Sequence, residues 1–347
     1  MTATEAGEIT NDAAQVSLAL VAERRLLLSP VDAFFRLHPG DRPLVVAGEA
    51  VTRGQPIVEH YRDPRTIVVS GPASASGRGA PGERWAATPG RNAREGDVTP
   101  SGELLFRSAG RWRIAGGDRP DPIDAPFAGV VREVRPGTGV TIRTTASGIL
   151  GSAALAGPTW GRLQVATGAD GELRAQHVDV GAAGSIVVAG ARMDAEALTR
   201  ARAVGIRGII VAALGIKEQR DFLASERRGR AAVHGLPPFG ILVLDGAGRR
   251  PIASAMMALF EAIEGTMVAI VGNPAALVID DPSIALPLPE PDLVRVRSGP
   301  LAGAEGTWAG VAGPRRFPAG VTLEAGFVRF GGRPPVAIPI GDLERFA

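Results

Sequence analysis

Hydrophobic residues form four short, unbroken runs in the second half of the chain. They cover residues 185–189, 208–212, 240–244 and 267–271. Continuous apolar runs of this length are typical of strands that are covered on both faces. Helical patterns separate the runs, so strand and helix alternate. This order predicts a small parallel sheet whose connecting helices make right-handed crossovers.

Three helices are expected between these strands. The first begins after Asp194, whose side chain can cap free backbone N–H groups, and it ends before Gly205. The second covers residues 217–228 and places two arginines at its negative carboxyl end. Pro251 opens the third, because proline at the first helical position has no N–H to leave unpaired.

Residues 16–150 show a different pattern, in which short apolar runs alternate with Pro-Gly-Asp and Arg-Gly turns. This alternation predicts short strands. Residues 71–102 interrupt it and are rich in Gly, Pro, Ala, Ser and Arg, so we expect a flexible loop there. Residues 1–15 are polar and without periodicity, and we expect them to form a disordered tail.

The last part of the chain returns to strand signals after a proline-rich segment. Residues 273–291 contain five prolines and are expected to form an extended linker. Five short strands are predicted beyond it, at residues 293–296, 306–311, 321–323, 327–330 and 336–340. That number of strands suits a small barrel.

The amino-acid composition excludes several kinds of functional site. The absence of cysteine excludes disulfides, thiolate zinc sites, iron–sulfur ligation and a cysteine nucleophile. No run approaches the 18 or so apolar residues of a membrane span, and the acidic N-terminus has no signal-peptide pattern. We therefore expect a cytoplasmic protein without membrane insertion.

The charge balance argues against a protein that wraps nucleic acid in general. Lys and Arg number 38 against 36 Asp and Glu, a net charge of +2. Lys217 is the only lysine, which leaves 38 − 1 = 37 arginines. The guanidinium group of arginine can bind phosphate through two parallel hydrogen bonds. The excess runs through every segment, however, as codon bias in a GC-rich genome would produce.

The sequence VRVRSGPLAGAEGT at residues 294–307 resembles the KOW motif of ribosomal proteins and NusG-type transcription elongation factors. The segment AIPIGDL at 337–343 is similar to the closing strand of the same SH3-like barrel. The resemblance implies contact with RNA, the ribosome or RNA polymerase. Its candidate phosphate partners are the arginines Arg295, Arg297, Arg315, Arg316, Arg329 and Arg333. The alternative is a barrel that binds protein or docks domains.

Two N-terminal segments resemble the halves of a barrel-sandwich hybrid. They are GEAVTRGQPIVE at residues 48–59 and DAPFAGVVREV at 124–134. Biotinyl and lipoyl carrier domains and the N-terminal part of RnfC-type redox subunits use this fold. A carrier needs a lysine at the hairpin tip, and the only lysine lies elsewhere, at Lys217. Only the fold is therefore carried over, and the missing cysteines exclude the RnfC-like electron role.

We accordingly predict a multidomain α+β protein. Its parts are an N-terminal β-rich, barrel-sandwich-like domain at residues 16–150, a central small parallel α/β domain at 151–272, and a C-terminal SH3-like β-barrel at 292–347.

The central domain has one candidate binding site. In open parallel sheets, ligands bind beyond the carboxyl ends of the strands, where helix N-termini present free N–H groups. The loop at residues 245–250 reads Asp-Gly-Ala-Gly-Arg-Arg and meets this criterion. The predicted anion or nucleotide-phosphate site comprises Arg192, Gly246, Gly248, Arg249 and Arg250. The alternative is an ordinary tight turn whose arginines face solvent or pair with Asp245.

No sequence feature indicates catalysis or a cofactor. Dinucleotide and P-loop motifs are missing, and there is no Gly-x-Ser-x-Gly elbow. The histidines His38, His60, His177 and His234 lack metal-ligand spacing. We therefore predict no catalytic residue, no metal and no cofactor.

The favoured function is a non-enzymatic adaptor that binds a ribonucleoprotein or transcription complex through the C-terminal barrel. One alternative is a scaffold subunit of a protein assembly without nucleic-acid contact. A second is a phosphate-ligand sensor or enzyme that uses the central domain. Phosphate contacts would make binding strongly salt-dependent, which separates the first two functions.

Overall fold

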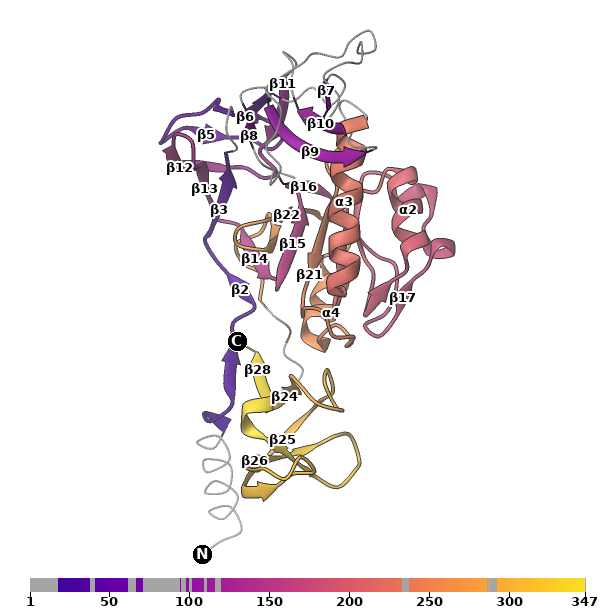
Figure 1. The fold of residues 1–347 in the computed structure, drawn as a ribbon. Coiled ribbons are helices and arrows are strands. Elements are labelled where there is room, and N and C mark those ends of the chain that lie inside the picture. Colours follow the sequence, from indigo (N-terminus) through magenta and orange to yellow (C-terminus); the bar gives the residue numbers. More distant parts are fainter. Residues whose placement is uncertain are drawn as a thin grey trace, which may run out of the picture.

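The computed structural model describes residues 18–37, 41–61, 67–70, 94, 98–99, 102–108, 111–115, 120–232, 237–285, 287 and 292–346. These residues are mostly β-structure arranged in several sheets, with helices on the central sheet (Figure 1). The predicted tail at 1–15 and most of the predicted loop at 71–102 lie outside the described residues.

A nine-stranded sheet forms the centre of the molecule, in the order β15-β21-β20-β18-β16-β22-β23-β14-β2. Its parallel part consists of β16 (Thr159–Val165), β18 (Ser185–Val188), β20 (Gly208–Val211) and β21 (Gly240–Val243). The last three strands are the first three predicted apolar runs. Every residue of these three strands is buried, as covered strands require.

The fourth predicted run, β22 (Met267–Val271), is antiparallel to β16 and not parallel as expected. The reason lies in the turn before it. Leu163 of β16 accepts a hydrogen bond from the N–H of Gly265 and donates one to the carbonyl of Thr266. The chain therefore enters β22 beside the carboxyl half of β16 and runs back along it.

Further strands of this sheet come from segments in which no strand of the sheet was predicted. They are β2 (Leu27–Leu28), β14 (Ser147–Leu150), β15 (Ala153–Ala156) and β23 (Ala276–Ile279). The structure places β23 in the sheet and not in an extended linker, because a tight turn pairs it with β22. All four of its residues are buried. The central sheet thus includes residues on both sides of the predicted 151–272 range.

Helices cover both faces of the parallel strands. Helices α2 (Ala195–Val204) and α3 (Ile216–Ala232) share one core cluster with alternate strand residues, and α4 (Ser254–Ala262) packs with the other set. The predicted ends of α2 are confirmed. Asp194 accepts a hydrogen bond from the N–H of Ala197, and Gly205 adopts φ 91°.

The remaining N-terminal strands form three small sheets. One contains β3 (Val31–Arg36), β13 (Gly139–Thr144), β12 (Gly129–Arg135) and β5 (Ala50–Val51). Another contains β11 (Pro120–Asp124), β6 (Pro56–Tyr61) and β4 (Arg42–Pro43). The third contains β7 (Ile67–Ser70), β10 (Arg111–Ala115), β9 (Gly102–Ser108) and β8 (Val98–Thr99). A short pair, β17 (Glu172–Leu173) and β19 (Arg192–Met193), flanks the central sheet.

The N-terminal strands share their core with the central sheet. Phe127 and Ile142 belong to one buried cluster with Ala269 of β22 and Val278 of β23. These strands and the central sheet are therefore packed together across the predicted domain boundary.

A six-stranded C-terminal sheet lies beneath the central sheet in Figure 1. Its order is β1 (Ala22–Arg24), β28 (Leu343–Phe346), β24 (Leu293–Val296), β25 (Glu305–Arg316), β26 (Thr322–Arg329) and β27 (Val336–Pro339). The predicted strands at 321–323 and 327–330 are joined in β26. The N-terminal strand β1 runs parallel to β28, and Leu18 and Val21 pack in the core of this sheet.

Candidate functional site

The carboxyl end of β21 meets the C-terminal sheet through buried charges. Asp245 follows β21, and its Oδ2 lies 3.0 Å from Nη2 of Arg295 on β24. Both side chains have an exposed fraction of 0%. Arg24 of β1 lies 2.6 Å from the other oxygen of Asp245. Glu344 of β28 completes the network, 3.4 Å from Arg24 and 3.7 Å from Arg295.

The neighbouring carboxylates favour the charged form of Arg24. Burial alone would lower the pKa of Arg24, but the hydrogen bond and charge of Asp245, with those of Glu344, outweigh it and raise the pKa above its ordinary value. Removing one charge would leave its partners uncompensated in a dry environment, which is strongly unfavourable. The network therefore ties β1, the loop after β21 and the C-terminal sheet into one unit.

Each of the three predicted anion-site arginines already has a partner within the chain. Arg192 is paired with Glu172 at 2.9 Å, and Arg249 lies 3.7 Å from Asp170. Arg250 donates to the carbonyl of Gly248 within the loop itself, at 3.4 Å. These contacts match the alternative of an ordinary turn more closely, although the arginines pair with carboxylates other than Asp245.

The two predicted glycines shape the loop. Gly246 has φ 98°, a left-handed conformation that glycine adopts without strain, and its carbonyl accepts a hydrogen bond from the N–H of Leu214. Beyond the loop, the N–H of Ser254 at the start of α4 donates to both oxygens of Glu305, at 3.0 and 3.3 Å. An anion therefore does lie at this helix N-terminus, and it is a carboxylate of the chain itself.

Of the predicted nucleic-acid-binding arginines, Arg295 is not exposed to solvent. Its guanidinium is fully buried in the charge network and cannot reach a phosphate on a partner. Arg297 is half exposed (52%) and lies 3.8 Å from Glu344.

The other four predicted arginines are exposed and form no ion pair with a described residue. Arg315 and Arg316 lie at the far end of β25, and the Arg315 guanidinium stands 5.7 Å from the centre of the Phe327 ring. Arg329 ends β26, and Arg333 follows it. Arg316 pairs in register with Thr322, seven positions before Arg329, so the two groups are up to about 23 Å apart along the strand.

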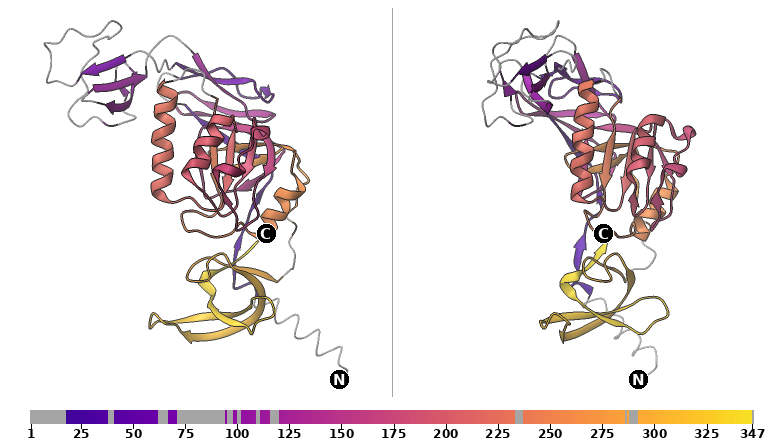
Figure 2. Two further views of the ribbon diagram at one scale, coloured as in Figure 1. Left: turned by 90° about the vertical axis from the view of Figure 1, so that its right-hand side faces the viewer. Right: turned by 45° about the vertical axis from the view of Figure 1, so that its right-hand side comes forward.

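The β25–β26 hairpin extends beyond its neighbours. We call residues 313–324 the arm. The arm projects from the C-terminal sheet, away from the rest of the molecule (Figure 2, left). Strand β27 pairs with residues 325–328 of β26 and leaves the arm without a third strand. Val321 and Leu323 on the arm are 48% and 44% exposed, beside Arg315 and Arg316.

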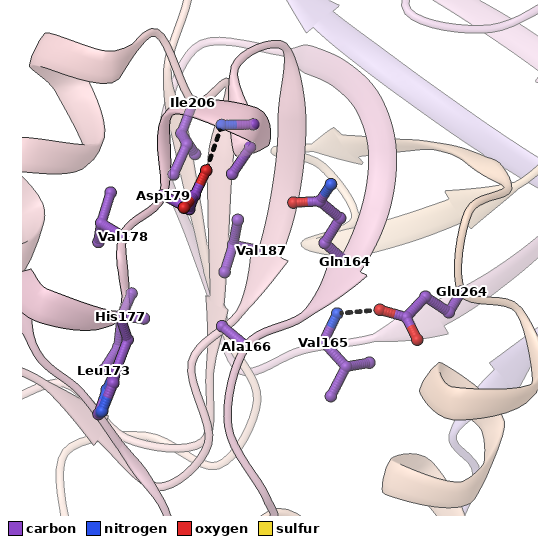
Figure 3. A pocket seen from close by; sticks show the side chains of 12 residues that line it. Gln164, Val165, Ala166, Leu173, His177, Val178, Asp179, Val187, Ile206 and Glu264 are labelled. Carbon is purple, nitrogen blue, oxygen red and sulfur yellow. Dashed lines mark hydrogen bonds between the residues drawn. The ribbon is translucent and has the colours of Figure 1, made fainter.

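A pocket of about 370 Å³ lies at another place, between β16, β18 and the turns before β18 (Figure 3). Its polar groups include Gln164, Asp179 and Glu264. Asp179 accepts from the N–H of Gly181, and Glu264 accepts from the N–H of Val165. Sequence reasoning missed this pocket because its lining residues span a hundred positions without a motif.

The described residues contain neither a metal-binding cluster nor a membrane-spanning helix. No group of three or more His, Asp or Glu residues in that part of the chain is arranged to hold a metal ion. None of its helices is both long and apolar enough to cross a bilayer. Of the four histidines, only His177 has a side chain among the described residues. Its Nδ1 accepts a hydrogen bond from the backbone N–H of Arg174. The side chains of His38, His60 and His234 fall outside the described residues.

No protein-family model, curated protein or solved structure matches this chain.

Proposed function

We propose that the protein is a non-enzymatic adaptor that docks on an RNA-containing assembly through the arm. The observation that carries this proposal is the pair Arg315 and Arg316, exposed on a projecting hairpin and without ionic partners among the described residues. Guanidinium groups in this situation are available for phosphate contacts. The charge network would hold the arm in a fixed orientation relative to the central sheet.

The charge distribution in the C-terminal segment supports the same function. Residues 292–347 contain seven arginines and five acidic residues, 7 − 5 = +2. Glu305, Glu344 and Arg295 belong to the charged contact with the central sheet, and without them six arginines and three acidic residues remain, 6 − 3 = +3. The outward side of the C-terminal sheet is therefore more basic than the total suggests.

The proposal also includes a fold for two parts of the chain. We interpret the C-terminal sheet as a KOW-type, SH3-like barrel, and the strands around β3, β12 and β13 as a barrel-sandwich hybrid. A cytoplasmic location, where RNA partners are found, fits this function.

The test is RNA binding by the full-length chain at several salt concentrations. Full length is needed because β1 supplies a strand, and Leu18 and Val21 supply core residues, to the C-terminal sheet. Replacing Arg315 and Arg316 by alanine should weaken single-stranded RNA binding and reduce the log–log salt slope by about 1.4. The control is Arg36→Ala with Arg220→Ala, which removes two exposed charges on β3 and α3. Equal loss in both double variants, or no binding at low salt, would refute the proposal.

A protein-only scaffold is the second candidate, and a specific observation favours it. Two exposed apolar residues lie on the arm and a third lies next to it: Val321, Leu323 and Val311 are between 44% and 48% exposed. Such a group suits a protein partner. Partner binding that resists salt and is lost in Leu323→Ser, with RNA binding absent, would support this function instead.

The phosphate-sensor alternative has weaker support. Its helix N-terminus is occupied by Glu305, and its arginines contact carboxylates or the loop backbone. A change in Tm with phosphate compounds would still test it.

A further inference from the structure

Helix α4 begins without a cap of its own. Ala253 stands at the N-cap position, and no side chain of the helix accepts from its first N–H groups. Such an N-terminus carries about half a positive charge from its unpaired N–H groups. The carboxylate of Glu305, 51 residues further along the chain, accepts from the N–H of Ser254 with both oxygens. It takes the place that a free anion would occupy.

Arg295 provides a second, independent feature of the same place. Its side chain is fully buried, and its Nε and Nη1 atoms have no hydrogen-bond partner. The Nε atom lies 3.9 Å from Oε1 of Glu305, within ion-pair range but too far for a hydrogen bond. The Nη1 atom lies 3.7 Å from Glu344, so Nε is the unpaired donor that faces Glu305. Leaving a buried N–H group unpaired is costly, and an acceptor placed beside Nε is therefore favourable.

The guanidinium is also fixed in position. Its Nη2 donates to the carbonyl of Pro251 at 2.6 Å and to Asp245 at 3.0 Å. These two acceptors lie on the loop that leads into α4. Arg295 and the start of α4 therefore form one rigid cradle, with positive groups on two sides of the Glu305 carboxylate.

The cradle remains accessible from one side. The Glu305 side chain is 16% exposed, whereas that of Arg295 is not exposed at all. The cradle lies at the carboxyl end of β21, the edge of a parallel sheet where ligands commonly bind. A small anion could enter where Glu305 now reaches solvent.

We propose that α4 and Arg295 form an anion site for a carboxylate and that Glu305 is its tethered, internal ligand. The contact is autoinhibitory, because Glu305 keeps soluble carboxylates out while it docks the C-terminal sheet on the central sheet. Removing the Glu305 carboxylate opens the site to an anion of the same chemistry and small size, such as formate or acetate. This inference is independent of RNA binding by the arm.

The test is anion rescue of Glu305→Ala in the full-length protein. Thermal unfolding is followed while sodium formate or acetate replaces sodium chloride at constant ionic strength. We expect Glu305→Ala to melt below the wild type and formate to raise its Tm saturably by about 2–4 °C. The wild type should not respond. Glu324→Ala, which removes an exposed carboxylate from β26, should resemble the wild type.

A second variant tests whether the space itself is required. In Glu305→Gln the amide oxygen can still accept from Ser254 and the side chain still fills the site, so formate should give no rescue. An equal response of all variants to formate would refute the site. If Glu305→Ala does not fold in chloride, formate must restore folded protein, and failure to restore it counts against the proposal.

Discussion

Arg295 and Asp245 form a buried ion pair, with 3.0 Å between Nη2 and Oδ2, that joins the C-terminal sheet to the central sheet. Breaking such a pair by removing one partner leaves the other charge buried and uncompensated. Asp245 also contacts Arg24 at 2.6 Å, so a single carboxylate neutralises guanidinium groups from two distant segments. It is the centre of the contact between the two sheets.

Replacing Asp245 by alanine should therefore cost about 3–5 kcal/mol of unfolding free energy. Urea unfolding followed by circular dichroism would measure it. The control is Asp170→Ala, which removes a carboxylate that is 74% exposed and lies 3.7 Å from Arg249. That change should cost less than about 1 kcal/mol. Similar costs for the two variants would contradict the central role of Asp245.

Gly303 sets how closely the two sheets approach. It has φ 89°, and a Cβ atom there would lie 2.7 Å from both Cβ of Arg250 and Cδ of Pro251. Gly303→Ala should thus combine backbone strain with a clash at the contact, and cost more than the 1–3 kcal/mol or so of strain alone.

Gly320 offers a matched control for this prediction. Its φ is 80°, but a Cβ atom would meet nothing within 4 Å. Gly320→Ala should therefore show the strain without the clash. Limited proteolysis and thermal unfolding would compare the variants. If both lose the same stability, close approach at Gly303 is not what limits the contact.

The N-cap of α2 is a local feature with a local cost. Asp194 accepts from the N–H of Ala197, and no other described residue takes over that bond. Asp194→Ala should lower the unfolding free energy by about 1 kcal/mol. Glu196→Ala, which removes a neighbouring acidic residue of the first turn, should cost only a few tenths of that. Equal costs would mean that helix-dipole charge, and not capping, explains the effect.

Local patterns predicted four of the nine strands of the central sheet, β18, β20, β21 and β22, and both ends of helix α2. Runs such as 208–212 are apolar because both faces are covered, and Asp194 and Gly205 mark a helix by capping chemistry that needs no distant partner. The direction of β22 could not be predicted in this way, because it depends on the hydrogen bonds between the turn after α4 and β16.

The candidate site was predicted less well, and Arg295 shows why. In the alternating sequence Val294-Arg295-Val296, one face of a strand is expected to be buried and the arginine face exposed. Here all three side chains are buried, because the second face of β24 packs against the loop at Asp245. Two of the carboxylates that make this burial tolerable, Asp245 and Glu344, lie about 50 residues away in either direction. No local signal could have identified them.

Asp32 gives the stability a measurable dependence on acidic pH. It lies opposite Arg143 in the β3–β13 pair and accepts from its Nε at 2.7 Å and from its Nη2 at 2.6 Å. Arg132 contributes a further ion pair at 2.5 Å. The hydrogen bond to Arg143, followed by the charges of Arg143 and Arg132, lowers the pKa of Asp32 below its ordinary value of 3.8, against the opposing effect of burial.

The direction of this pH dependence follows from the numbers of protons bound by the folded and unfolded states. Between the lowered folded pKa and 3.8, the unfolded chain binds more protons than the folded one, so stability rises with pH. The contribution is complete above the unfolded value and is lost as pH falls through the folded one. Asp32→Asn should therefore lower Tm at pH 6 and have a smaller effect near pH 2.5. In an Arg143→Gln background the pH-dependent difference should shrink, and an undiminished difference would assign it to another group.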